Sequence, residues 1–234
     1  MTATEIRARL RKLGNKQRAE VSRRYFKTGP GQYGEGDIFL GLSAPQLRKL
    51  AVEYQAIATD DLLELLKSPT HEERMLALLI LVRAYSRGDE TAKLNAYELY
   101  LGNAQFINNW DLVDASAPYI VGHFLMGRNK KPLYALAKSP SLWERRISII
   151  STLHFVRRGE VAETLKISKL LLADKEDLIH KAVGWALREV GKRDLASEES
   201  FLREHYRRMP RTMLRYAIER FPEPQRQMYL KGKI

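Results

Sequence analysis

An internal near-repeat constrains the fold of this chain more than any other feature. The run Lys-Ser-Pro-Thr-His-Glu-Glu-Arg begins at Lys67, and the run Lys-Ser-Pro-Ser-Leu-Trp-Glu-Arg begins 71 positions later, at Lys138. Each run is followed by an apolar stretch with helical spacing, residues 75–87 and 146–158. The offset corresponds to two units of a helical-pair repeat of about 35 to 40 residues each. The sequence therefore predicts stacked pairs of helices.

The remainder of the chain supports this architecture. Gly88 and Gly159 close the two repeated helices, where a left-handed residue is expected. From Ser43 onward apolar positions recur at helical spacing, and no segment alternates as a strand does. We therefore predict an all-α fold, an α-solenoid of HEAT-like helical-pair repeats with a concave basic groove. No linker interrupts the pattern, so residues 1–234 are predicted to form a single domain.

The N-terminal region is expected to contain two helices followed by a connection. Thr4 is predicted to cap an amphipathic helix that ends at Gly14, and a second helix is expected over Lys16–Lys27. The glycine-rich stretch Thr28–Gly41 lacks the Gly-Lys-Ser/Thr ending of a phosphate-binding loop, so we expect a mobile connection rather than a nucleotide site. Ser43 is predicted to cap the helix that follows.

The net positive charge of the chain indicates which kinds of partner it can bind. Lys and Arg outnumber Asp and Glu by 40 to 28, a formal net charge of +12. This excess favours a polyanionic partner, with nucleic acid the commonest and an anionic membrane surface the rival. The longest purely apolar run, Met75–Val82, is too short to span a bilayer, and residues 4–26 lack the apolar core of a signal peptide. With no cysteine present, we expect a soluble, cytoplasmic protein.

One predicted helix carries an unusual pair of side chains. Asn109 is expected to act as its N-cap, and Trp110 opens it. Asp114 follows four positions later, so the indole and the carboxylate share one helical face. Pro118 removes a backbone donor and predicts a kink. Taken alone, this spacing also fits a core tryptophan beside a capping aspartate.

The repeat spacing relates Trp110 to residues in later repeats. Arg146 and Trp185 stand 36 and 75 positions after Trp110, close to one and two repeat lengths. Equivalent positions of successive repeats lie on one face of a solenoid, so these residues and Asp114 are predicted to line one groove. The alternative is that both tryptophans belong to the core between helices.

The chemistry that the sequence lacks is as informative as what it holds. The five histidines form no metal-ligand spacing, and neither His-Glu-x-x-His nor Gly-x-Ser-x-Gly occurs. No metal and no cofactor are therefore predicted. A carboxylate at Asp114 suits the stabilisation of an oxocarbenium-like sugar or the orientation of a water. Indole faces at Trp110 and Trp185 suit contact with a deoxyribose, and Arg146 suits a phosphate.

Four motifs stand out along the chain: Phe39-Leu40-Gly41-Leu42-x-x-Pro45-x-x-Arg48, Trp110-Asp111-x-Val113-Asp114, Leu142-Trp143-x-x-Arg146 and Lys181-Ala182-x-Gly184-Trp185-x-Leu187-Arg188-Glu189. Together they resemble one family, the AlkD-type DNA alkylation repair glycosylases. The resemblance runs in the same order from about Arg23 to Phe221.

The resemblance implies excision of cationic bases such as 3-methyladenine and 7-methylguanine from double-stranded DNA, without flipping the base into a pocket. It implies that Asp114 is the catalytic carboxylate and that Trp110 and Trp185 contact the sugar. The expected DNA contacts, with Tyr25 placed near the lesion, are Arg146, Tyr25, Arg48, Arg188, Lys181 and Arg211. A monomer acting at the nucleoid is expected.

Two other readings of the same sequence remain open. A catalytically inactive DNA-binding solenoid would use the same basic groove without needing Asp114. A protein-interaction scaffold is the commonest use of helical repeats and would bind in a salt-tolerant way. Steep salt dependence separates the DNA-binding readings from the scaffold, and base release separates the enzyme from both.

Overall fold

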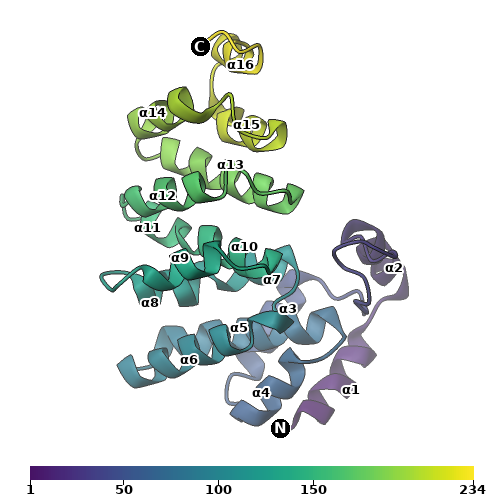
Figure 1. The fold of residues 1–234 in the computed structure, drawn as a ribbon. Coiled ribbons are helices and arrows are strands. Elements are labelled where there is room, and N and C mark those ends of the chain that lie inside the picture. Colours follow the sequence, from purple (N-terminus) through teal and green to yellow (C-terminus); the bar gives the residue numbers. More distant parts are fainter. The chain divides into compact units, whose positions relative to one another are not determined.

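The computed structural model describes residues 1–234 and is helical throughout (Figure 1). The only strand-like pairing is one isolated parallel bridge between Ile38 and Thr70. The prediction of an all-α fold built of packed helical pairs is confirmed. The chain divides into two compact units, residues 1–116 and 117–234. No helix combines the length and the apolar composition that crossing a membrane requires.

The first unit is organised around one long helix. The helix α5 packs against α3, α4, α6 and α7, and α1 packs against α4. The elements of this unit are α1 (Ala3–Leu13), α2 (Lys16–Tyr25), α3 (Ala44–Glu53), α4 (Thr59–Leu66), α5 (His71–Arg87), α6 (Glu90–Gly102), η1 (Ala104–Phe106) and α7 (Trp110–Ser116).

The second unit is organised around α10 and α13, which pack against each other and against most of their neighbours. Its elements are the π-helical turn η2 (Pro118–Gly122), α8 (His123–Leu125), α9 (Lys131–Ala137), α10 (Leu142–Ser151), α11 (Leu153–Val156), α12 (Ala162–Leu170), α13 (Asp177–Gly191), α14 (Leu195–His205), α15 (Arg211–Ala217), η3 (Ile218–Arg220) and α16 (Glu223–Leu230). The kink predicted at Pro118 takes the form of this π-helical turn.

The near-repeat is visible in matching hydrogen bonds at the starts of α5 and α10. The guanidinium of Arg74 donates to the carbonyl of Ser68 at 2.9 Å, and that of Arg145 donates to the carbonyl of Ser139 at 3.0 Å. The hydroxyl of each serine also accepts from the backbone N–H two residues later, at 3.0 Å in both places. The same short run therefore builds the same helix entry twice.

Some predicted helix ends differ from the observed ones. The first helix is capped by Thr2, whose hydroxyl forms a capping box with Glu5, and not by Thr4. Gly159 has the expected left-handed conformation (φ 83°), but Gly88 has a φ of −73° and is extended. The second repeated helix is also interrupted, since α10 ends at Ser151 and α11 ends at Val156. Ser43 caps α3 as predicted, in a capping box with Gln46.

The glycine-rich stretch is anchored in its second half, where we expected a mobile connection. The Glu72 carboxylate at the start of α5 accepts from the backbone N–H groups of Leu40, Gly41 and Leu42, with the shortest contact 2.7 Å to Gly41. Gly41 has a φ of 81°, and a Cβ there would lie 2.2 Å from the carbonyl oxygen of Asn15. Only glycine fits this close approach of two backbone segments.

The close packing of α13 on α15 gives a first testable prediction. In Gly184→Ala the new Cβ would lie 2.4 Å from the carbonyl oxygen of Met213 and 2.5 Å from the Cβ of Tyr216. Forcing the helices apart should destabilise the protein by about 1 to 3 kcal/mol. This outweighs the gain in helix propensity of about 1 kcal/mol.

Thermal unfolding measures this effect against a matched control. Gly102→Ala, at the end of α6, adds a Cβ that meets nothing within 4 Å. It should leave the melting temperature unchanged or slightly raised. A Gly184→Ala protein as stable as Gly102→Ala would show that α13 and α15 do not pack as closely as described.

Candidate functional site

The start of α7 is fixed by a fully buried asparagine. The side-chain oxygen of Asn109 accepts from the backbone N–H of Trp110 at 2.8 Å, so the predicted contact with an N–H group of the first turn is present. Its side-chain nitrogen donates to the carboxylate of Asp37 at 3.3 Å. One side chain therefore both caps the helix and ties it to the second half of the glycine-rich stretch.

An aromatic cluster, defined as Tyr25, Phe26, Phe39 and Trp110, lies at the same end of α7. Phe26 stacks on Trp110 with ring centroids 5.5 Å apart and on Phe39 at 5.1 Å. Tyr25 meets Trp110 edge-on at 5.9 Å and is 64% exposed. Trp110 and Phe26 are half-buried, so three rings of the cluster reach solvent at least in part, and Phe39 is buried inside.

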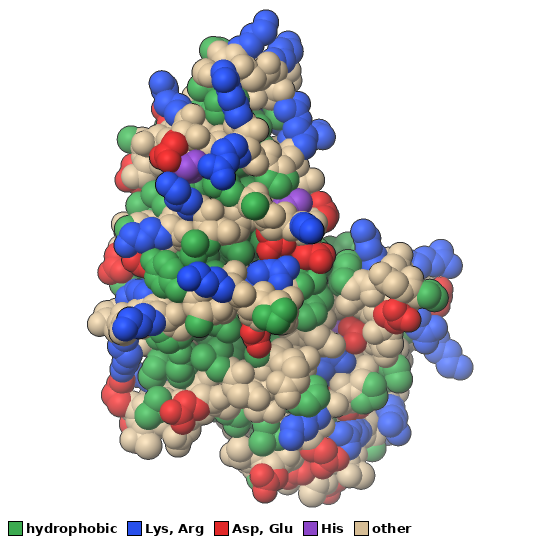
Figure 2. Space-filling view, viewed as in Figure 1, with side chains coloured by type: hydrophobic (Ala, Val, Ile, Leu, Met, Phe, Trp, Pro, Cys, Tyr) green, Lys and Arg blue, Asp and Glu red, His purple; other side chains and the backbone are tan.

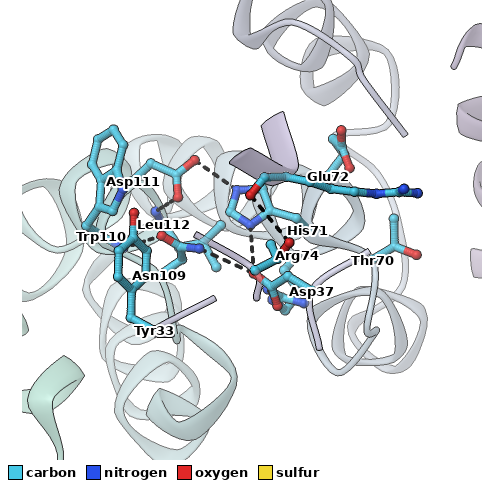
Figure 3. Close-up of polar contacts among 12 residues, drawn as sticks. Tyr33, Asp37, Thr70, His71, Glu72, Arg74, Asn109, Trp110, Asp111 and Leu112 are labelled. Atoms are coloured by element: carbon cyan, nitrogen blue, oxygen red, sulfur yellow. Dashed lines mark hydrogen bonds and ion pairs between the residues drawn. The ribbon is translucent and has the colours of Figure 1, made fainter. Parts of the chain in front are cut away.

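A buried histidine lies against this cluster and joins two carboxylates (Figure 3). The ring of His71 is 4.6 Å from that of Phe39 and 4.9 Å from that of Phe26. Its Nε2 lies 2.9 Å from a carboxylate oxygen of Asp111, and its Nδ1 lies 3.3 Å from one of Asp37. Asp37 also accepts from the guanidinium of Arg74 at 2.6 Å. These four polar residues and Asn109 form a continuous network, called the buried network, in which only the Asp111 side chain, at 18% exposed, is half-buried.

The network holds His71 in its charged form. Burial acts to lower the pKa of His71, but the hydrogen bonds to Asp111 and Asp37 outweigh it and raise the pKa to about 9. Burial acts to raise the pKa of Asp37, but the hydrogen bond from His71 and the charge of Arg74 bring it below its usual value. At neutral pH both ring N–H groups of His71 therefore donate.

Asp114 lies one turn after Trp110 on α7 and is half-buried. Behind it, the fully buried Tyr100 shares a hydrogen bond with the hydroxyl of Ser116 at 2.9 Å, and that hydroxyl donates to the carbonyl of Leu112 at 2.5 Å. Burial raises the pKa of Tyr100, and the nearby charge of Asp114 raises it further. The phenol is therefore neutral and serves to pack and fix α7.

In the second unit the two central predicted residues differ in accessibility. Trp185 on α13 is half-buried, and its indole N–H donates to Glu189 at 3.2 Å. Arg146 on α10 is only 4% exposed, and its guanidinium donates to the carbonyl of Leu178 at 2.6 Å. Arg146 therefore joins α10 to the first turn of α13, a structural contact that the sequence motif did not indicate.

The remaining predicted DNA contacts are accessible to different degrees. Arg48 on α3 and Arg211 on α15 are exposed, and Arg211 also donates to the carbonyl of Leu230 at 2.7 Å. Lys181 forms an ion pair with Asp177 at 2.7 Å, and Arg188 forms one with Glu219. Basic side chains gather over the C-terminal helices α14 to α16 (Figure 2).

Three residues of the buried network were not singled out from the sequence: Asp37, His71 and Asp111. A usable signal exists, because four consecutive polar residues, all of them buried, lead directly into the apolar run Met75–Val82 of α5. Buried charged side chains need partners, so such a run indicates a polar network. No group of three or more His, Asp or Glu side chains is arranged to hold a metal ion.

Comparisons with known proteins found one matching family and a solved structure with a similar fold. The family model described as "DNA alkylation repair enzyme" matches residues 6–221. A solved structure described as a predicted DNA alkylation repair enzyme from Enterococcus faecalis superposes with a TM-score of 0.68. It is 17% identical, and the alignment covers 90% of this chain and 97% of that one, which shows a shared fold. No curated protein matches the sequence.

The network predicts that the stability of the protein falls as the pH rises from about 6.5 to above 9. A histidine whose pKa is raised by folding stabilises the fold fully below its unfolded pKa, near 6.5. That stabilisation is lost as the pH passes the folded pKa of about 9. The expected loss is on the order of 3 kcal/mol. Urea unfolding across this range measures it.

The variant His71→Gln isolates this contribution. Burial also raises the pKa of Glu198 on α14, to about 8, and an acid of this kind destabilises the fold as the pH rises from 4.5. Glu198 is present in the wild type and in His71→Gln. The difference between their stability profiles against pH therefore reports the contribution of His71. Identical profiles would mean that His71 is not held as an imidazolium.

Proposed function

Because this chain belongs to the family of DNA alkylation repair enzymes, we propose that it is a DNA glycosylase acting on cationic alkylated purines in duplex DNA. The substrates proposed are 3-methyladenine and 7-methylguanine, taken without flipping the base into a pocket. The observation that supports this best is the half-buried Trp110 and Asp114 on one face of α7, whose first turn is fixed by the buried network. The enzyme is proposed to act as a monomer without a metal.

The proposed chemistry is hydrolysis of the bond between C1′ of the sugar and the purine nitrogen. An N-alkylated purine carries a positive charge and leaves as a neutral base when that bond breaks, so it requires no proton donor. The sugar passes through an oxocarbenium-like state, and the Asp114 carboxylate stabilises that charge or orients the attacking water. The water forms the new bond at C1′ and loses its proton to solvent or to the carboxylate.

The aromatic side chains have a matching proposed role. The indole face of Trp110 attracts the developing positive charge of the sugar, as in cation–π contacts. Its stacking on Phe26 restricts rotation of the ring, so little conformational freedom is lost when the sugar binds. The exposed ring of Tyr25 is proposed to lie near the lesion, and Trp185 is proposed to contact the sugar.

The positive charge of the chain supports a DNA substrate. A net charge of +12 favours binding that is driven by the release of counterions from phosphates. Arg48 and Arg211 are proposed as phosphate contacts, together with Lys181 and Arg188 once DNA competes with their carboxylate partners. Arg146 is proposed as a phosphate contact as well, but its bond to the carbonyl of Leu178 would have to be exchanged.

The test of this function is release of free 7-methylguanine from methylated duplex DNA by the purified protein in the presence of a chelator. Release would support a metal-independent glycosylase. Tight, salt-sensitive DNA binding without release would favour the inactive DNA-binding protein. Binding that is weak and insensitive to salt would favour the protein-interaction scaffold.

The variant Asp114→Asn tests the role of the carboxylate. It retains the size and much of the hydrogen-bonding capacity of the side chain but removes the negative charge, and Asn and Asp have similar helix propensities. DNA affinity should be unchanged or slightly increased. Single-turnover excision should fall by about a hundredfold or more, the usual effect of losing one preorganised electrostatic group. A melting curve shows whether the variant is folded, and near wild-type excision by a folded variant would remove Asp114 from the mechanism.

The variant Arg48→Ala tests the DNA contacts. If Arg48 contacts a phosphate, affinity should fall and the slope of log K against log salt should decrease by about 0.9. Because Arg48 is exposed, the melting temperature should not change. Lys138→Ala removes the same charge at another exposed position to which no contact is assigned, and it should leave the slope close to that of the wild type. Equal slopes for the two variants would show that Arg48 acts only through the overall charge.

A further inference from the structure

The four polar residues that open α5 bind several different parts of the first unit. All four are buried, with exposures of 3% or less. Glu73 pairs with Arg7 on α1 at 2.9 Å, and Glu72 accepts from the backbone of residues 40–42. Arg74 pairs with Asp37. Of the four, His71 is the residue whose hydrogen bonds reach α7.

His71 and Asp37 hold both neighbours of Trp110. Asn109, which precedes Trp110, donates directly to Asp37. Asp111, which follows Trp110, is joined to Asp37 through the imidazole of His71 (Figure 3). The first turn of α7 is therefore fixed on both sides of the indole, and Asp114 lies one turn further along the same helix.

The near-repeat supplies an internal comparison for this network. At the equivalent positions α10 opens with Leu142 and Trp143, where α5 has His71 and Glu72. Both helices begin with the same serine and arginine hydrogen bonds, so the helix entry does not require the histidine. Replacing a buried ion pair by well-packed apolar residues is often neutral or stabilising. The histidine is therefore not required for the helix entry itself, and its distinguishing feature is the link to α7.

We propose that His71 is a positioning residue for base excision, which clamps Asp111 to Asp37 and so holds Trp110 and Asp114 in the geometry that the reaction needs. This inference rests on the proposed glycosylase function. The clamp requires the imidazolium, because a neutral imidazole donates from one nitrogen only and turns a lone pair toward the other carboxylate. The charged groups that face His71 are Asp37, Asp111 from α7 and Arg74 from α5.

The proposal predicts a specific pH dependence of excision. In the wild type, the single-turnover rate of 7-methylguanine release should fall as the pH passes about 9, where His71 loses its proton. In His71→Gln the rate should already be lower by about tenfold or more at neutral pH, since small misplacement of catalytic groups is costly. It should also show no such fall near pH 9. DNA affinity should change less than threefold in the variant.

A neighbouring variant separates positioning from stability. Glu73→Gln removes a buried charge from the same run, but Glu73 pairs with Arg7 on α1 and not with α7. It should lower the melting temperature and keep the wild-type pH profile of excision. If His71→Gln fails to fold, Asp111→Asn weakens the same clamp at its half-buried end. It removes one of the two carboxylates that raise the pKa of His71, so the alkaline fall in rate should move to lower pH.

The outcomes distinguish this inference from the function on which it rests. No release of 7-methylguanine by the wild-type protein overturns both. Release by the wild type with an equal rate and pH profile in a folded His71→Gln or Asp111→Asn overturns the positioning role alone. Loss of the alkaline fall in Glu73→Gln as well as in His71→Gln would also overturn it, because the effect would then follow from stability.

Discussion

The first unit depends most on the hydrogen bonds that the carboxylate of Asp37 accepts. This carboxylate accepts hydrogen bonds from His71, Arg74 and Asn109, and its side chain is only 7% exposed. A carboxylate removed from water in this way is stable only when charged partners replace the solvent. The three partners come from the start of α5 and from the residue before α7, so one buried charge fixes the glycine-rich stretch, the central helix and the candidate site relative to one another.

The second repeat also pairs the arginine at its helix entry with a carboxylate, but the carboxylate comes from a different part of the chain. Arg145, the counterpart of Arg74, forms an ion pair with Asp174 at 2.6 Å. Asp174 follows the arginine in the chain and precedes α13, whereas Asp37 precedes Arg74. The requirement common to both repeats is a carboxylate for an arginine that also binds the carbonyl six residues before it. The polar connection to α7 is an addition found only in the first.

The sequence was sufficient for most features that depend on neighbouring residues. Helical periodicity predicted the all-α fold, and residue type predicted the roles of Asn109 and Ser43 at helix starts, whereas the cap at Thr4 and the left-handed Gly88 were wrong. The network around His71 was missed because its partners are 34 and 40 positions away, beyond any periodicity in the sequence. For Arg146 the difficulty was a different one. A motif predicted a phosphate partner for this residue, but it did not indicate that the side chain would be buried and bonded to the carbonyl of Leu178. The concave groove and the single domain stay predictions.

The proposed substrate gives a reason for holding the start of α7 in place with several buried charged groups. A base that already carries a positive charge needs no protonation, so the rate of its loss depends on how well the protein stabilises the sugar cation. That stabilisation depends on where a carboxylate and an indole lie, and a shift of about 1 Å is enough to reduce it strongly. A short helix such as α7 has little intrinsic stability. Its capping by Asn109 and the ionic link at Asp111 therefore supply an order that the helix itself cannot.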